Sequence, residues 1–536
     1  MIGLAPPGRP PPDRAGSAPP PSPRPAPRLR ARQSGAVGSR TGAVRPLRSP
    51  GTASAIQRAL THSLVRLSWL PIVAIIAAHI VFGLEAFPLV ARVILAVPAV
   101  LFLVESRTYL SSERRELPFL PLALLQFYAA FGLPVFFEAP FSDLGGPVFF
   151  SDAVRIEASM VVALGSLSLW GAARIAMRFG GGLELRALAI LPPAASGDGS
   201  DQAFYVYVGL TLLTIWVNLF AQKLMPGSFA MLINTMFMIE FAIGLATVRP
   251  PARLGARASS ALATLGIAAG FLAGQIDPMG RVVMTYVSAQ WVATRRLAVG
   301  FIIALVLIFV VVQPIKSRYR AAAWQGNDIG VVGRVDAWQS AFSDAHDGSL
   351  RSQREDSALD RLSHLSPVMN ALLVVPSRLD YAYGATLAQL LYAPIPRLIW
   401  PEKPTTKEEV TQRYAIIFHL QTEKGAQTTA IGMCLIVEGL WNLGWLGVLF
   451  ACGGVGLLIG AQQRLFSGTH WALRAAGAAQ LANLNAVVPL VIVYGALFQC
   501  TVARILSVWM IHLLAQILGT KAGRAPVGGA RNVARG

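Results

Sequence analysis

Residues 433–460 read MCLIVEGLWNLGWLGVLFACGGVGLLIG, a run of 28 residues with a single charged side chain, Glu438. A bilayer core of about 30 Å needs about 20 consecutive apolar residues in a helix, so this segment is long enough to cross a membrane. Comparable runs recur along the 536-residue chain, of which 54% is hydrophobic and only 14% charged. A soluble core cannot contain so much apolar surface, and the composition therefore predicts an all-α polytopic membrane protein.

Twelve apolar segments are predicted to span the membrane, with both termini in the cytoplasm. Alternate loops carry arginines, for example Arg107, Arg174 and Arg249, whereas the opposite loops are acidic or nearly neutral, as at 140–152. Because cytoplasmic loops are enriched in Lys and Arg, this alternation sets the orientation. The predicted spans are 67–85, 87–104, 118–137, 157–176, 203–221, 228–247, 260–275, 281–294, 297–313, 433–460, 476–498 and 501–519.

These spans divide the chain into five parts. Residues 1–60 are rich in Pro and Arg and lack the apolar residues that folding needs, so we expect a disordered, basic, cytoplasmic tail. An over-extended start codon is the alternative explanation for this segment. The other parts are spans one to nine at 61–313, a large external loop at 314–431, spans ten to twelve at 432–519, and a basic cytoplasmic tail at 520–536.

Several function classes are disfavoured by the sequence. The net charge of +19 resides in tails and short loops, which is a membrane-orientation pattern rather than a nucleic-acid surface. Cys434, Cys452 and Cys500 form no CxxC pair, so we expect buried free thiols and neither a zinc site nor a disulfide framework. Walker A, GxGxxG, HExxH and GxSxG motifs are absent, and we expect no metal, nucleotide or other cofactor.

The external loop contains a segment that cannot be helical, APIPRLIWPEKP at 393–404. Its four prolines each remove a backbone donor and clash with the preceding turn. A rigid loop would present Arg397 and Trp400 at the bilayer surface, with Lys403 as a further cation. The arginine fork matches phosphate or carboxylate oxygens, and the alternative is an interfacial arginine that merely snorkels.

Other parts of the loop are predicted to be helical and apposed to the membrane. Residues 332–345 are amphipathic, with Val335, Trp338, Ala341 and Phe342 at helical spacing. Residues 365–376 form a second apolar run that is too short to span the bilayer.

Polar candidates for a site lie in the loop and at neighbouring span ends. Arg378 and Asp380 are in the loop, and Arg281 and Glu438 should face the same side of the membrane. A carboxylate at membrane depth indicates function, although an interfacial carboxylate remains the competing interpretation of Glu438. The aromatic side chains that could stack on sugar faces, or else belong to an interfacial belt, are Tyr383, Trp400 and Trp441.

These features, in this order, resemble Wzy-type polymerases of O-antigen and exopolysaccharide repeat units. Gly280-Arg281 follows a mid-chain span, and the external loop contains YxYG at 381–384 and PRLIWPEKP at 396–404. The motif ExxxNxG (Glu438, Asn442, Gly444) then opens the next span. The resemblance covers residues 280–447, and outside them only hydropathy agrees.

The resemblance implies a lipid-sugar transferase of the GT-C-like, all-helical class in a bacterial inner membrane. It would transfer an undecaprenyl-pyrophosphate-linked glycan to another lipid-linked repeat unit in the periplasm. Further partners would be membrane lipid and the flippase and chain-length regulator of the same pathway. Candidates for a cationic clamp on the pyrophosphate are Arg281, Arg397, and Arg334 or Arg378. Candidates for the general base, which the sequence does not rank, are Glu438, Asp380 and His419.

Three other functions stay open at the level of sequence. An O-antigen ligase would share the layout and the donor but deliver the glycan to lipid A core. A transporter or flippase for lipid-linked glycans is a different class, yet such proteins tend to contain internal repeats, and none is evident here. A structural partner in an export complex is the third, and its loop arginines would have no role in chemistry.

Overall fold

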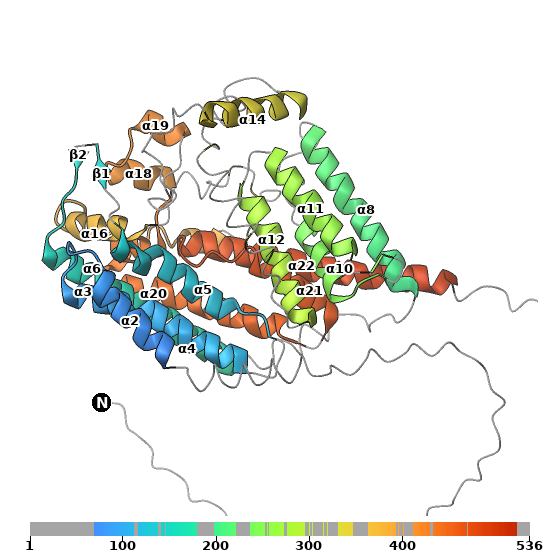
Figure 1. Cartoon of the computed structure of the whole chain (residues 1–536), viewed down its shortest axis with the longest axis horizontal. Helices are drawn as coiled ribbons and strands as arrows, with labels where there is room; N and C mark the ends of the chain where they lie inside the picture. Colours follow the sequence, from blue (N-terminus) through green and yellow to red (C-terminus); the bar gives the residue numbers. More distant parts are fainter. Residues whose placement is uncertain are drawn as a thin grey trace, which may run out of the picture. The chain divides into compact units, whose positions relative to one another are not determined.

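The computed structural model describes most of the chain from residue 69 onward. The described residues are 69–111, 116–137, 141–144, 146–179, 198–220, 236–251, 254–255, 257–272, 276–294, 331–346, 363–392, 411–428, 432–468 and 470–522, with 300, 303, 315, 319, 395, 400 and 402. This part is almost entirely helical (Figure 1) and so confirms the all-α class. The elements are α2 (Leu70–Phe82), α3 (Leu89–Leu95), α4 (Val97–Ser111), α5 (Phe119–Phe127), η1 (Tyr128–Gly132), η2 (Leu133–Phe136), β1 (Ser142–Asp143), β2 (Gly146–Pro147), α6 (Asp152–Phe179), α8 (Asp198–Phe220), α10 (Ile239–Val248), α11 (Arg257–Leu272), α12 (Ile276–Thr294), α14 (Val331–His346), α16 (Leu365–Val374), α17 (Gln389–Tyr392), α18 (Arg413–Ile417), α19 (Glu423–Thr428), α20 (Leu435–Phe466), α21 (Trp471–Leu481) and α22 (Leu490–Ala522).

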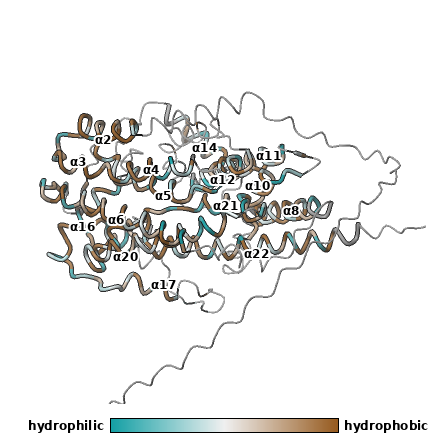
Figure 2. Tube along the Cα trace, turned by 90° about the horizontal axis from the view of Figure 1, so that it is seen from below, coloured by the Kyte–Doolittle hydropathy of each residue, from teal (hydrophilic) through white to brown (hydrophobic). Residues whose placement is uncertain are grey.

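Within the described residues, five helical segments are long and apolar enough to cross a membrane, which indicates a multi-pass membrane protein. They are Leu89–Leu110, Phe119–Phe136, Asp152–Phe179, Leu435–Phe466 and Leu490–Leu518. Apolar residues predominate along these helices (Figure 2), and large side chains such as Trp216, Phe450 and Trp509 point outward from the protein. The described residues do not establish the predicted count of twelve spans, and most of the predicted span at 297–313 lies outside them.

The helices of residues 69–522 form two groups that share one apolar core (Figure 1). In the first group, α20 packs along α6, and α3, α4, α5 and α16 pack around this pair. In the second group, α10 contacts α11, α12 and α21, and α22 runs along α8. Contacts of α20 with α21 and α22 join the groups.

Glycines allow α6 and α20 to approach at backbone distance. A Cβ atom added to Gly456 would lie 2.2 Å from the Leu169 carbonyl oxygen, and one added to Gly460 would lie 2.4 Å from that of Ala173. Lipid tails are as apolar as leucine side chains, so helices in a membrane associate mainly through close packing, often over small residues four positions apart. Gly456 and Gly460 have this spacing.

One loop predicted outside the cytoplasm contacts the large loop. The amide of Leu144 donates to the carbonyl oxygen of His419 at 2.8 Å, which joins the loop at 140–152 to the large loop. The helices α5 and α20 are also joined, since the amide of Leu120 donates to Gln463 Oε1 at 3.2 Å.

The boundary predicted between the last two spans is wrong. The break expected near residues 499–500 lies inside α22, which is one continuous helix from Leu490 to Ala522. The chain instead reverses at 482–489, between α21 and α22. Asn483, Asn485 and Pro489 explain the reversal, since Asn favours turns and a proline disfavours helix at the residue before it. The apolar residues between them hid this signal in the hydropathy pattern.

The predicted helices of the large loop are present, with one face corrected. α14 buries Trp338 and Ala341 as expected, and the Trp338 indole donates to the Phe271 carbonyl oxygen at 2.9 Å. Val335 was predicted on this apolar face but is 39% exposed. Ala337 is buried instead, in a cluster with side chains from α11 and from the segment that precedes α14. α16 has ten residues and is too short to span a bilayer.

We expect Gly460→Ala to lower the free energy of unfolding by about 1–3 kcal/mol, because the added methyl group forces α6 and α20 apart. The measurement is the thermal unfolding of the purified protein in detergent. Gly171→Ala is the matched control, since a Cβ on this glycine of α6 meets nothing within 4 Å. Equal midpoints for the two variants would contradict the proposed packing.

Candidate functional site

The first turns of α20 fold back against the rest of that helix. Leu443 (φ −145°, ψ 24°) and Gly444 (φ 61°, ψ −139°) leave helical geometry and form a kink. A Cβ added to Gly447 would lie 2.0 Å from the Gly439 carbonyl oxygen across this kink. The backbone of Gly444 is in a region that only glycine adopts readily, which explains the glycine of ExxxNxG.

The YxYG segment is hydrogen-bonded to this kink through Asn442. The amide of Ala382 donates to the Trp441 carbonyl oxygen at 2.8 Å, and the amide of Tyr383 to that of Asn442 at 3.1 Å. The amide of Gly384 donates to Asn442 Oδ1 at 3.0 Å. Residues 381–386 and 438–444 therefore form one unit, referred to below as the motif unit.

Asn442 uses its donors within the same unit. Its Nδ2 donates at 2.7 Å both to Thr386 Oγ1 and to the Glu438 carbonyl oxygen. The Asn442 side chain is fully buried, and an amide that bonds on both its oxygen and nitrogen sides avoids the cost of unsatisfied buried groups. This residue aligns the large loop with the start of α20.

The side chain of Glu438 is fully buried and joins the motif unit to α22. Its Oε2 accepts a hydrogen bond of 2.6 Å from the amide of Leu490, the first residue of α22. Its Oε1 accepts one of 3.3 Å from Thr386 Oγ1. A carboxylate at a helix N-terminus is stabilised by the free amides and the helix dipole, so Glu438 acts as a cap supplied by another helix.

The two other candidates for the general base lie outside this buried network. Asp380 is exposed and immediately precedes the motif unit. His419 is also exposed, and its backbone has a φ of 55°. Tyr414, near His419, is fully buried, and burial raises the pKa of its hydroxyl well above the ordinary value, so it stays neutral.

Arg281 reaches the α21–α22 connection from the side of α12. Its Nη1 donates to Asn483 Oδ1 at 3.2 Å, and its Nη2 lies 3.1 Å from Asp277 Oδ2. The connection ends at Leu490, which binds Glu438. The segment 482–490 is therefore hydrogen-bonded to the basic side chain of Arg281 near its start and to the acidic side chain of Glu438 at its end.

The other predicted cations are not gathered at this place. Arg378 is exposed two residues before Asp380, and Arg334 lies half-buried on α14 beside Tyr319. Among the described residues, no hydrogen bond joins Arg334 to the motif unit. Arg397 and Lys403 lie outside the described residues, as does most of APIPRLIWPEKP.

Two of the three aromatic residues considered for sugar stacking are exposed. Tyr383 is 76% exposed and Trp400 is 40% exposed, the latter in edge contact with Tyr392. Trp441, in contrast, is buried in edge contact with Phe418 and is a core residue. Of the two interpretations offered for Trp441, sugar stacking and an interfacial belt, its burial leaves no open ring face for a sugar.

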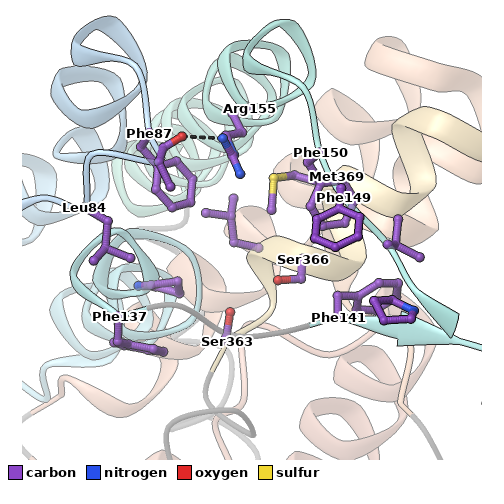
Figure 3. A pocket seen from close by; sticks show the side chains of 15 residues that line it. Leu84, Phe87, Phe137, Phe141, Phe149, Phe150, Arg155, Ser363, Ser366 and Met369 are labelled. Atoms are coloured by element: carbon purple, nitrogen blue, oxygen red, sulfur yellow. Dashed lines mark hydrogen bonds between the residues drawn. The ribbon is translucent and has the colours of Figure 1, made fainter.

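An aromatic cavity that was not predicted lies between the α2–α3 loop, the β1–β2 hairpin and the start of α16. It has a volume of about 130 Å³, and five of its fifteen lining residues are phenylalanine, with Arg155, Ser363 and Ser366 as polar side chains (Figure 3). Arg155 donates to the Ala86 carbonyl oxygen and lies over the Phe87 ring. In the sequence, the density of Phe and Pro at 134–150 was the signal from which this cavity could have been predicted. Burial lowers the pKa of His364, next to the cavity, to about 4, so its ring is neutral at pH 7.

The cysteines are as expected: Cys434, Cys452 and Cys500 are free and buried. In the part of the chain that the structure describes, no three His, Cys, Asp or Glu side chains gather closely enough to hold a metal ion.

Comparison with known proteins gives one match. A family model described as "Domain of unknown function (DUF8712)" matches residues 204–471, half of the chain. The match includes Arg281, the large loop and the motif unit, and it ends at the first residue of α21. No curated protein and no solved structure matches the chain.

We expect Asn442→Asp to lower the free energy of unfolding by about 2 kcal/mol or more, since two donated hydrogen bonds become contacts between acceptors. Thermal unfolding of the purified protein checks this. The matched control is Asn485→Asp, which adds the same charge but keeps the oxygen that accepts from the Val487 amide. A similar loss of stability in both variants would argue against the motif unit.

Proposed function

The chain belongs to the DUF8712 family, and we propose that it polymerises oligosaccharide repeat units linked to undecaprenyl pyrophosphate at the periplasmic face of a bacterial inner membrane. The proposal rests on the resemblance to Wzy-type polymerases, which is built on Arg281, YxYG, PRLIWPEKP and ExxxNxG. The multi-pass architecture supports a membrane-bound substrate. The flippase and the chain-length regulator of the same pathway are the proposed partners.

One observation supports this proposal above the others. YxYG and ExxxNxG are more than fifty residues apart in the sequence, yet five hydrogen bonds, from Ala382, Tyr383, Gly384, Thr386 and Asn442, join them into one unit. Motifs that were recognised separately are thus parts of one structural unit. The unit holds the large external loop against the membrane-spanning helix α20, which is where a lipid-linked sugar would present its reacting bond.

The proposed reaction is a glycosyl transfer without metal or nucleotide. A hydroxyl oxygen of the acceptor sugar forms a bond to the anomeric carbon of the donor. The bond from that carbon to the lipid pyrophosphate breaks, and the electron pair leaves with the pyrophosphate. Arginine side chains stabilise the charge that develops there, and we assign this role to Arg281, with Arg397, which lies outside the described residues, as a second candidate.

The proton of the attacking hydroxyl passes to a carboxylate. We assign Asp380 as this base, because it is exposed three residues before the exposed Tyr383, whereas both oxygens of Glu438 are already bonded inside the protein. Glu438 is then a positioning residue that acts through Thr386 and Leu490. Tyr383 and Trp400 supply aromatic faces for the glycan.

The aromatic cavity suits the hydrocarbon part of the same substrate. Its volume of about 130 Å³ is close to that of engineered apolar cavities of about 150 Å³ that bind benzene. A sugar would need more hydrogen-bond partners than Arg155, Ser363 and Ser366 provide. We assign this cavity to a segment of the polyprenyl chain.

We expect a deletion strain to carry surface polysaccharide with single repeat units only, and the wild-type gene to restore long chains. Gel electrophoresis of the surface polysaccharide, with analysis of the lipid carrier, is the measurement. Long chains that accumulate on the undecaprenyl carrier would indicate a ligase instead. Repeat units that remain on the cytoplasmic side would indicate a flippase.

We expect Asp380→Asn to abolish polymer at unchanged protein level, because an amide does not accept the proton. Glu438→Gln should retain most polymer, since its carbonyl oxygen can still accept from Leu490 and its amide can donate to Thr386. The two variants differ from the wild type by the same change in charge, so each controls for the other. Loss of polymer in Glu438→Gln, with the thermal midpoint unchanged and Asp380→Asn active, would make Glu438 the base.

A further inference from the structure

Arg155 lies at the opening of the aromatic cavity. Its side chain lines the cavity and is 22% exposed, and Phe149, which also lines the cavity, is 89% exposed (Figure 3). Residues that face both the cavity and the exterior mark the place where the cavity opens. The guanidinium carbon of Arg155 lies 5.5 Å from the centre of the Phe87 ring, which is part of the wall. The cavity thus combines an apolar interior with a cationic group at its opening.

The guanidinium of Arg155 keeps one edge free. Its Nη1 donates to the Ala86 carbonyl oxygen and lies 3.4 Å from Asp152 Oδ1. Within the part of the chain that the structure describes, Nε and Nη2 make no hydrogen bond. These two nitrogen atoms form the side of the fork that binds two oxygens of a phosphate at once. Asp152 does not block this edge, and its side chain is 74% exposed, so the pair is a weak surface ion pair.

The cavity lies where apolar helical segments begin and end. The segment Phe119–Phe136 ends just before the wall residue Phe137, and the segment Asp152–Phe179 begins three residues before Arg155. Leu84, another wall residue, follows the end of the apolar helix α2. Helices that cross a bilayer leave its hydrocarbon core at the level of the lipid headgroups. Arg155 is therefore placed to bind a lipid phosphate.

The covalent structure of a lipid decides whether it can occupy both the arginine and the cavity. In a bilayer phospholipid, glycerol and its ester groups separate the phosphate from the hydrocarbon, and burying their oxygens among phenyl rings is unfavourable. In a prenyl phosphate, the branched hydrocarbon begins at the phosphate ester itself. The cavity of about 130 Å³ has room for about one five-carbon isoprene unit, since apolar cavities of about 150 Å³ hold benzene.

We propose that Arg155 and the aromatic cavity form a binding site for a prenyl phosphate. The free edge of Arg155 binds the phosphate oxygens, and the isoprene unit next to the phosphate lies among the phenyl rings. Arg281 does not line this cavity, and a reaction between two lipid-linked substrates needs two lipid phosphate sites. That Arg155 serves one of these substrates rests on the proposed function; the prenyl phosphate site itself does not.

The test is the thermal unfolding of the full chain at a fixed detergent concentration. The probes are farnesyl phosphate, farnesol, dihexanoyl phosphatidic acid and inorganic phosphate. We expect a saturable rise of the midpoint with farnesyl phosphate, and binding of the other three probes that is weaker by about tenfold or more. Arg155→Gln should lower the affinity for farnesyl phosphate about tenfold or more and leave that for farnesol unchanged.

A second variant tests the cavity rather than the charge. Ala86 is an exposed residue of the cavity wall, so Ala86→Phe fills the opening without disturbing the core. This variant should bind both farnesyl phosphate and farnesol more weakly than the wild type. Arg178→Gln, at an exposed arginine near the other end of α6, is the matched control and should bind as the wild type does. If Arg155→Gln fails to fold, the affinities of Ala86→Phe decide.

Absence of saturable farnesyl phosphate binding would overturn the site, as would unchanged affinity in both variants. Equally tight binding of dihexanoyl phosphatidic acid would replace the prenyl phosphate by a bilayer phospholipid, and equally tight binding of inorganic phosphate would remove the cavity from the site. The polysaccharide gel separates these results from the proposed function. Farnesyl phosphate binding by a chain whose deletion leaves polymer unchanged would keep the site and remove the polymerase, and loss of polymer on deletion without such binding would do the reverse.

Discussion

The carboxylate of Glu438 is held where water cannot replace its partners, and three distant parts of the chain depend on those partners. Its two oxygens bind Thr386 in the large loop and Leu490 at the start of α22, while the residue itself lies in the first turn of α20. A buried polar group that loses its partner costs free energy that a membrane protein cannot recover from solvent. The arrangement of loop and helices is therefore coupled to one side chain.

Asn442 adds further hydrogen bonds between the large loop and α20. Its side-chain oxygen accepts from Gly384, and its side-chain nitrogen donates to Thr386 and to the Glu438 carbonyl oxygen. These bonds fix the position of the YxYG segment relative to α20. The same geometry leaves Asp380 and Tyr383 exposed at the edge of the unit. Positioning a substrate requires reactive side chains that are held by a rigid part of the protein. The buried hydrogen bonds of the motif unit supply that rigidity, and the exposed groups lie at its edge.

The α21–α22 connection relates this unit to the charges among the helices. Arg281 binds Asn483 near the start of the connection and Glu438 binds Leu490 at its end. Arg504 lies deeper in α22, against the N-terminus of α10. Glu105 and Glu438 are thus bonded within the protein, whereas Arg504 Nε, Arg504 Nη1 and Arg281 Nε have no hydrogen-bond partner among the described residues.

The sequence by itself determined the membrane class, the large loop and its two short helices, because hydropathy and periodicity are local properties of consecutive residues. It also identified YxYG and ExxxNxG, but as separate motifs, since the hydrogen bonds between 382–384 and 441–442 join residues that only folding brings together. The reversal at 482–489 escaped it because Ala486, Val487 and Val488 kept the window apolar around Asn483 and Pro489. Arg504 escaped it for the same reason, as one charge averaged into a span. Only the tertiary structure decided that this charge meets the N-terminus of α10, because compensation of a buried charge depends on which helices pack around it and not on its neighbours in the chain.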